Sequence, residues 1–241
     1  MNTQSLLKVL TAAGIGSRRR VADAIKHERV TVNGQVVTNF SHPVNIETDR
    51  ILFDGKRIEL KPEKAVILML NKPAGVISTV SDERGRQTVI DLLPKKYRHL
   101  RLYPVGRLDK NSTGVLLLTN DGELAYRLTH PRFEHKKEYL VHIKDSLNLK
   151  EKQGLERGLK LEDGMTHPAK VNEVIPATPF NYSITIHEGR KRQVRRMFDS
   201  LGHNVLALKR VRMGNLNLGD LPEGNVRELS AQEVSKLLNR D

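Results

Sequence analysis

One loop of the chain gathers side chains that acid–base or nucleophilic chemistry uses. Residues 106–114 read Gly-Arg-Leu-Asp-Lys-Asn-Ser-Thr-Gly, and an apolar run at 115–118 follows directly. The run predicts a buried strand, which would anchor the loop on its downstream side and hold the carboxylate of Asp109 in place. Because Asp, Asn, Ser and Gly also favour turns for backbone reasons, the composition of the loop alone favours a solvated turn. The order of its residues is more informative than their types.

Three other segments carry motifs in a fixed order around this loop. They are Asn-Lys-Pro-Ala-Gly at 71–75, Lys-Glu-Tyr-Leu-Val at 137–141, and Glu-Gly-Arg-Lys-Arg-Gln-Val-Arg-Arg-Met-Phe at 188–198. With Gly-Arg-Leu-Asp and the downstream Thr-Asn-Asp-Gly at 119–122, they resemble the motifs of pseudouridine synthases. The similarity is to the RsuA/RluB-type branch, which acts on ribosomal RNA. It covers nearly the whole chain, in the order and spacing of that family.

The resemblance implies an isomerase that breaks the glycosidic bond of a uridine, turns the uracil and rejoins it through carbon. It assigns the carboxylate to Asp109, either as a nucleophile on the sugar or as a base that removes a sugar proton. It assigns to Arg195 the cation that keeps this carboxylate ionised. Tyr139 would face the uracil, and Arg107 would fill the space that the flipped base leaves. Tyr139 is also a residue type common in strand cores, and its neighbours do not decide between these readings.

The charge of the chain favours a polyanionic partner. Its 41 Lys and Arg outnumber 28 Asp and Glu, which gives a net charge of +13 and a pI near 10.0. Residues 189–212 alone hold eight basic residues and one acid. We predict ribosomal RNA as the partner, free or in assembling subunits. The arginines expected to contact it are Arg18, Arg19, Arg20, Arg190, Arg192 and Arg196, although exposed basic helix turns alone would give a similar pattern.

Composition also limits the cofactors and the location. The chain has no cysteine, its nine histidines lack metal-ligand spacing, and it contains neither G-x-G-x-x-G nor a P-loop. We therefore expect no metal, no nucleotide cofactor and no other cofactor. No apolar run approaches the roughly 18 residues that span a bilayer. These features predict a cytoplasmic monomer that does not bind membranes.

The chain is expected to form two domains of the α+β class. In residues 1–62, two short helices, the second capped by Ser17, precede hairpins around Asn-Gly and Asp-Gly. With Gly-Ser-Arg-Arg at 16–19, this module resembles the RNA-binding domain of ribosomal protein S-four. A polar hinge at 61–64 sets the boundary, and residues 63–241 would form the catalytic domain.

The predicted catalytic domain has a mixed, mainly antiparallel sheet flanked by helices, the pseudouridine synthase fold. Apolar runs with strand character predict the strands, and amphipathic spacing predicts the helices. The predicted strands are 66–70, 115–118, 139–143, 182–186 and 205–208. The predicted helices are 88–93, 122–128, 149–158, 194–201 and 231–238.

Two other functions fit parts of the sequence. A non-catalytic RNA-binding ribosome-assembly factor could keep the fold, but it would not need a carboxylate beside phosphates. A metal-dependent nuclease is disfavoured because no other carboxylates cluster around Asp109. The segments 82–86 and 161–164 resemble the branch that modifies the large-subunit RNA more than the small-subunit branch. The sequence does not identify the modified uridine.

Overall fold

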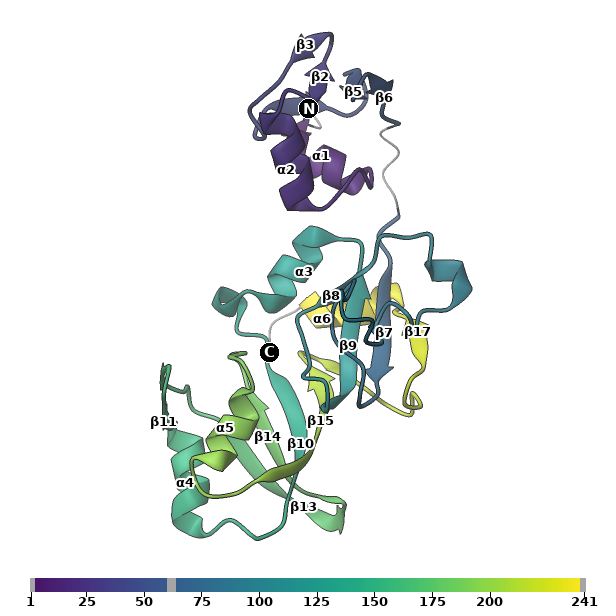
Figure 1. Ribbon diagram of the computed structural model, residues 1–241. Helices are drawn as coiled ribbons and strands as arrows, with labels where there is room; N and C mark the ends of the chain where they lie inside the picture. The colour runs from purple at the N-terminus through teal and green to yellow at the C-terminus, as the bar shows by residue number, and fades with distance from the viewer. Residues whose placement is uncertain (1–2, 60–63, 239–241) are drawn as a thin grey trace. The chain divides into compact units, whose positions relative to one another are not determined.

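The computed structural model of the chain (Figure 1) describes residues 3–59 and 64–238. The chain divides into two compact units, Met1–Ala65 and Val66–Asp241, and each is considered by itself. The predicted domain boundary, between residues 62 and 63, lies outside the described residues. None of the described helices is long and apolar enough to cross a membrane.

The amino-terminal unit pairs two helices with short antiparallel strands. Ser17 caps the second helix, since its hydroxyl accepts a hydrogen bond from the backbone N–H of Arg20. Both expected hairpins form, with Asn33 and Asp54 at positive φ ahead of their glycines. The elements are β1 (Thr3–Ser5), α1 (Leu6–Ala12), α2 (Arg18–Lys26), β2 (Val30–Val32), β3 (Gln35–Val36), β4 (Pro43–Asn45), β5 (Ile51–Phe53) and β6 (Lys56–Arg57).

The second unit is built on one large sheet. Among the described residues its strands run in the order β13-β14-β10-β15-β9-β7-β17, with β8 on β9 and β16 on β15. The pair β9–β15 is parallel and the other pairs are antiparallel, which confirms the predicted fold class. The strands are β7 (Ile67–Lys72), β8 (Tyr103–Val105), β9 (Thr113–Thr119), β10 (Lys137–Ile143), β13 (Lys170–Thr178), β14 (Phe180–Ile186), β15 (Val205–Met213), β16 (Leu216–Asn217) and β17 (Val226–Glu228). A separate hairpin comprises β11 (Lys160–Leu161) and β12 (Gly164–Met165).

Helices cover both faces of this sheet because its central strands are apolar on both sides. Met69 and Leu117 belong to one core, with side chains from α3 (Gly122–Thr129) and α6 (Ala231–Leu238). Leu68 and Leu116 point the other way, as alternation along a strand requires. They belong to the larger core, with side chains from α4 (Leu149–Arg157) and α5 (Gln193–Asp199). Two short 3₁₀ turns, η1 (Lys95–Tyr97) and η2 (Pro131–Phe133), complete the unit.

The predicted helix at 88–93 is wrong, since the segment forms turns. Val89 and Leu93 are buried at the i, i+4 spacing of a helix. However, the N–H of Val89 donates to the carbonyl of Ile77 on a neighbouring segment. The carboxylate of Asp91 accepts from the backbone and the hydroxyl of Thr88. These bonds satisfy the local polar groups without a helical turn.

Sequence analysis also missed β13, an outer strand of the sheet. The segment contains Pro176, a residue that counts against a strand because it has no N–H for the ladder. Edge strands tolerate proline, since one of their sides has no partner strand. In addition, Pro176 lies where the β13–β14 register is interrupted, between Glu173 and Thr178.

Gly114 fixes the parallel junction between β9 and β15. Its φ is +101°, and a Cβ atom at this position would overlap the backbone carbonyl of Arg210. Only glycine allows the start of β9 to approach the opposite backbone this closely. The loop that precedes β9 is thereby joined to the middle of β15.

We expect Gly114→Ala to destabilise the protein more than Gly219→Ala, a matched control. Gly219 also has a positive φ, +61°, but a Cβ atom added there would meet nothing within 4 Å. The control should cost about 1–2 kcal/mol from backbone strain alone, and Gly114→Ala about 1–3 kcal/mol more from overlap. Urea denaturation of both variants measures the difference. Equal losses of stability would contradict the close approach.

Candidate active site

The loop between β8 and β9 carries Asp109, and hydrogen bonds to Ser78 and within the loop fix its backbone. The hydroxyl of Ser78 donates to the carbonyl of Leu108 at 2.9 Å and accepts from its N–H at 3.1 Å. The N–H of Ser112 donates to the carbonyl of Asp109 at 3.0 Å. Strand β9 follows with a fully buried centre, so the loop has the downstream anchor that the sequence predicted. Asp109 itself stays partly exposed.

The ammonium group of Lys72 lies beneath this loop. Lys72 ends β7 with no exposed surface, and its Nζ donates to the carbonyls of Pro73, Lys110 and Ser112 at 2.8, 3.1 and 2.9 Å. Burial lowers the pKa of Lys72 to about 8, against the opposing effect of the negative charge of Asp109. Two charge-assisted hydrogen bonds, to Lys110 and Ser112, thus connect the end of β7 to the part of the loop that follows Asp109, and the third stays within the turn after β7.

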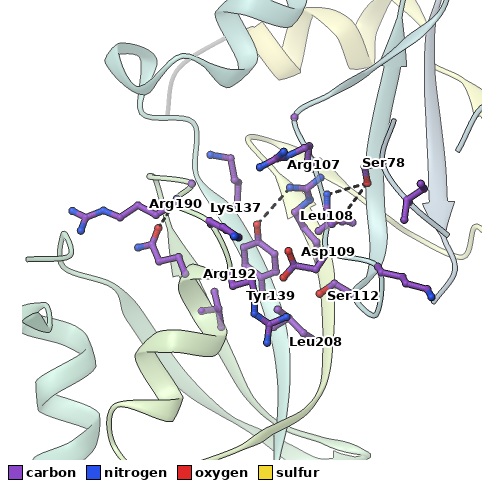
Figure 2. Close-up of a pocket in the computed structure, with 18 of the residues that line it drawn as sticks. Ser78, Arg107, Leu108, Asp109, Ser112, Lys137, Tyr139, Arg190, Arg192 and Leu208 are labelled. Carbon is purple, nitrogen blue, oxygen red and sulfur yellow. Dashed lines mark hydrogen bonds between the residues drawn. The ribbon is translucent and has the colours of Figure 1, made fainter. Parts of the chain in front are cut away.

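Asp109 and Tyr139 face the same pocket, which has a volume of about 630 Å³. Figure 2 shows the Asp109 carboxylate directed toward the Tyr139 ring. Tyr139 is only 9% exposed and also belongs to the larger hydrophobic core. The two readings of Tyr139 are therefore compatible, because one face of the ring can pack while the side chain lines the pocket. Arg107 is exposed and lines the pocket as well.

Arg210 is a pocket residue that sequence analysis did not select. On β15 it lies in register with Tyr139 on β10 and with Gly114 on β9. Arg210 is 3% exposed. Its Nε donates to the carbonyl of Val115 at 2.7 Å, and its Nη1 lies 3.4 Å from the Tyr139 hydroxyl. Its Nη2 is buried and has no hydrogen-bond partner among the described residues. Strand β15 also carries Lys209 and Arg212, so its composition gives no signal that singles out Arg210.

Lys137 is a second cation in the pocket that the sequence did not single out. It precedes Tyr139 by two residues, so both side chains leave the same face of β10. Its Nζ lies 3.5 Å from the carbonyl of Glu188. Burial and, to a smaller extent, the positive charge of Arg210 lower the pKa of Lys137 to about 8.

Arg195 lies on α5 and is buried, with 8% of its surface exposed. Its Nη1 donates to the carbonyl of Val205 at 2.7 Å, while its buried Nε has no partner among the described residues. Burial and the charge of Arg192 lower the pKa of Arg195, and the charge of Asp109 opposes them. Within the part of the chain that the structure describes, Arg195 and Asp109 form no ion pair. The expected pairing therefore stays a prediction.

The predicted RNA-binding arginines of this unit differ in their contacts. Arg192 takes a left-handed conformation at the N-cap of α5 and lines the pocket, and no described residue pairs with its guanidinium. Arg196 instead pairs with Asp163 through both terminal nitrogens, at 3.0 and 2.8 Å. Arg190 pairs with Glu188 at 3.0 Å and also contacts Asp163. Of these three arginines, Arg192 is the most available to a ligand in the pocket.

The predicted RNA-binding arginines of the other unit lie in the first turn of α2. The side chains of all three are exposed. Their exposure on a capped basic helix agrees with either reading of the sequence, an RNA contact or an ordinary solvated turn. These residues are Arg18, Arg19 and Arg20.

Two family profiles match this chain. The family described as RNA pseudouridylate synthase matches residues 66–200, more than half of the chain, and includes the Asp109 loop, β10 and α5. The S4 domain matches residues 4–51 in the amino-terminal unit.

Full-length relatives agree with these matches. The chain is 44% identical to ribosomal large subunit pseudouridine synthase B of Bacillus subtilis, over 97% of this chain and 95% of that protein. It is 40% identical to the protein of the same name from Vibrio cholerae, over 98% of this chain and 74% of that one. A crystal structure of a pseudouridylate synthase superimposes with a TM-score of 0.68 at 32% identity, covering 97% of this chain and 99% of the other. The chain is therefore a member of the RNA pseudouridylate synthase family, with an S4 domain at its amino-terminal end.

Proposed function

We propose that this protein isomerises a uridine of large-subunit ribosomal RNA to pseudouridine. The observation that carries this proposal is the 44% identity to the Bacillus subtilis large-subunit enzyme, because it extends over both units of the chain. The segments 82–86 and 161–164, which favoured the large subunit in the sequence, lie within the matched length. The proposed partner is ribosomal RNA, free or in an assembling subunit, and the proposed setting is the cytoplasm with the protein as a monomer.

Asp109 is the proposed catalytic carboxylate. It could form a bond to the sugar carbon C1′ as uracil leaves, or remove the proton on C2′. Both routes use the carboxylate form of Asp109, and the positive charges of Lys72 and Arg195 lie near enough to interact with it. Tyr139 would stack against the uracil with its ring and could relay a proton through its hydroxyl. The reaction leaves the redox state unchanged, so the proposal requires no cofactor.

A uridine in folded RNA must leave its helix to reach this pocket. Flipping costs a few kcal/mol, and contacts with the opened RNA must offset that cost. Arg107 supports such a role, since it is exposed at the pocket beside Asp109 and its guanidinium makes no hydrogen bond or ion pair with the described residues. We propose that Arg107 occupies the space vacated by the base. A pocket of about 630 Å³ is in the range that small ligands the size of a nucleoside occupy.

The remaining arginines are proposed to hold the RNA backbone around the flipped base. Arg192 lies at the pocket, whereas Arg190 and Arg196 would first have to exchange their contacts with Asp163 for phosphates. The exposed basic turn of α2 in the S4 domain would dock a separate part of the RNA. These residues are Arg18, Arg19 and Arg20.

Asp109→Asn should abolish pseudouridine formation while leaving RNA affinity and thermal stability near the wild-type values. The substitution keeps the shape of the side chain but removes the ionised oxygen. The assay uses large-subunit ribosomal RNA from cells that lack this protein, with Asp145→Asn, an exposed aspartate, as the matched control. Pseudouridine is measured by nuclease digestion and mass spectrometry.

A rate for Asp109→Asn above about a tenth of the wild-type rate would refute the catalytic role. If the wild-type protein binds the RNA tightly but forms no pseudouridine, the alternative of a non-catalytic assembly factor would replace the proposed function.

Arg192→Ala should weaken RNA binding and flatten its salt dependence, because one phosphate contact is lost. The slope of log affinity against log salt concentration should shrink by about 0.7–0.9. Arg196→Ala is the comparison and should reduce the slope less, because a phosphate contact at Arg196 requires the loss of its ion pair with Asp163. Binding titrations at several salt concentrations measure both slopes. An equal change of slope for the two variants would contradict the proposal that Arg192 contributes more to phosphate binding than Arg196.

A further inference from the structure

Two cations in the pocket have no role in the function proposed above. Arg210 and Lys137 both line the pocket beside Tyr139. Arg210 comes from the middle of β15 and Lys137 from the start of β10, the strand next to it. The proposed chemistry uses Asp109, Tyr139 and Arg195 but neither of these residues.

Protein groups leave part of the hydrogen-bonding capacity of both cations unused. The buried Nη2 of Arg210 has no partner among the described residues, and its Nη1 reaches the Tyr139 hydroxyl only at 3.4 Å. Within the same part of the chain, the Nζ of Lys137 has one hydrogen-bond contact, the carbonyl of Glu188 at 3.5 Å. An unsatisfied buried donor costs about 1–3 kcal/mol, so such groups usually have a reason to persist. Because both residues line the pocket, an anionic ligand there would supply hydrogen-bond acceptors that the protein does not.

The position of the two cations favours an anionic base over a phosphate as their ligand. The guanidinium carbon of Arg210 lies 5.9 Å from the centre of the Tyr139 ring, and Lys137 is on the same strand face as that ring. They are therefore placed around the residue proposed to stack on the uracil. Arg192, in contrast, is exposed at the N-cap of α5, where it can meet a phosphate.

Resting on the proposed function, we infer that Lys137 and Arg210 together stabilise the uracil ring as an anion while it is detached from the sugar. When the C1′–N1 bond breaks, its electron pair stays with the uracil, and the negative charge spreads over N1 and the two carbonyl oxygens. The ring then bonds to C1′ through C5, loses the C5 proton and gains a proton on N1. The product is neutral, so the cations stabilise only the intermediate and the transition states around it.

Stabilising the uracil anion affects the reaction rate, whereas binding a phosphate affects RNA affinity. A phosphate is charged before, during and after the reaction, so a cation that binds it contributes mainly to RNA affinity. The uracil anion exists only after bond breaking begins, so its stabilisation appears in the rate of the chemical step. Positioned charges in a pocket that excludes water commonly contribute about 10²–10³-fold to such rates.

The test compares two transcripts of large-subunit ribosomal RNA, one made with uridine and one with 5-fluorouridine. Fluorine withdraws electrons and makes the detached ring a more stable anion, so its departure depends less on protein cations. Single-turnover rates of nucleoside loss are measured by digestion and chromatography. The variants are Lys137→Gln, Lys137→Arg and Arg210→Lys, with Lys144→Gln, an exposed lysine, as the control. Thermal melting checks that each variant folds.

Lys137→Gln should slow loss of uridine about 10²-fold but loss of 5-fluorouridine only about tenfold or less, with RNA affinity unchanged. Lys137→Arg should recover much of the uridine rate because it restores the charge. Arg210→Lys should also slow loss of uridine more than loss of 5-fluorouridine. This variant provides the test if Lys137→Gln does not fold.

Equal losses on both transcripts would overturn the inference, because a merely structural residue does not sense the leaving group. Weaker RNA binding with an unchanged rate would also overturn it and would assign the two cations to a phosphate. If the wild-type protein converts no uridine, the proposed function fails, and this inference fails with it. Asp109→Asn separates the cases, since it should stop loss of both nucleosides even if the cation inference is wrong.

Discussion

The geometry of the pocket depends on one buried charge. Lys72 has no exposed surface, yet its ammonium donates hydrogen bonds to the neighbouring Pro73 carbonyl and to the carbonyls of Lys110 and Ser112, which follow Asp109 in its loop. Moving an ammonium group out of water costs several kcal/mol, which its hydrogen bonds must offset. Two of these carbonyls, those of Lys110 and Ser112, accept their bonds only when the loop has the observed conformation. The cost of burial therefore selects one loop conformation, and with it the position of the carboxylate.

The sheet supplies the other side of the pocket. Strand β15 pairs with β10 on one edge and with β9 on the other, so Arg210 lies in register with both Tyr139 and Gly114. Gly114 allows the parallel approach because a larger residue would overlap the Arg210 backbone. The loop held by Lys72 and the strand that carries Arg210 thus meet at one glycine. A small shift of either element would change how the Asp109 carboxylate and the Arg210 guanidinium are placed relative to each other in the pocket.

The sequence predicted the features that depend on a few neighbouring residues, such as turns, helix caps and apolar strands. The Asn33 and Asp54 turns, the Ser17 cap and the strand after Asp109 follow from backbone preferences and apolar runs. The motifs predicted the family, which the comparisons show. The segment 88–93 was misread because side-chain and cross-segment hydrogen bonds replaced the helical ones.

The rest of the site depends on contacts between segments distant in sequence. No local pattern reveals that Lys72 donates to carbonyls about forty residues later. The register that brings Arg210 to Tyr139 joins segments 71 residues apart. The burial of Arg195 on α5, with its bond to Val205, likewise follows from packing against β15. These contacts form only when the chain is folded, so they become visible only in the structure.

The central claim is that the buried Lys72 ammonium holds Asp109 in its reactive position, and Lys72→Met tests it most directly. Lys110→Met is the matched control, because it removes an exposed charge from the same loop and keeps the carbonyl that Lys72 binds. The measurement is the single-turnover rate of pseudouridine formation on protein shown to be folded and to bind RNA. The account predicts a fall of about 10²-fold or more for Lys72→Met, the loss expected from misplacement by about 1 Å, and a much smaller change for Lys110→Met. A near-wild-type rate for folded Lys72→Met would contradict the account.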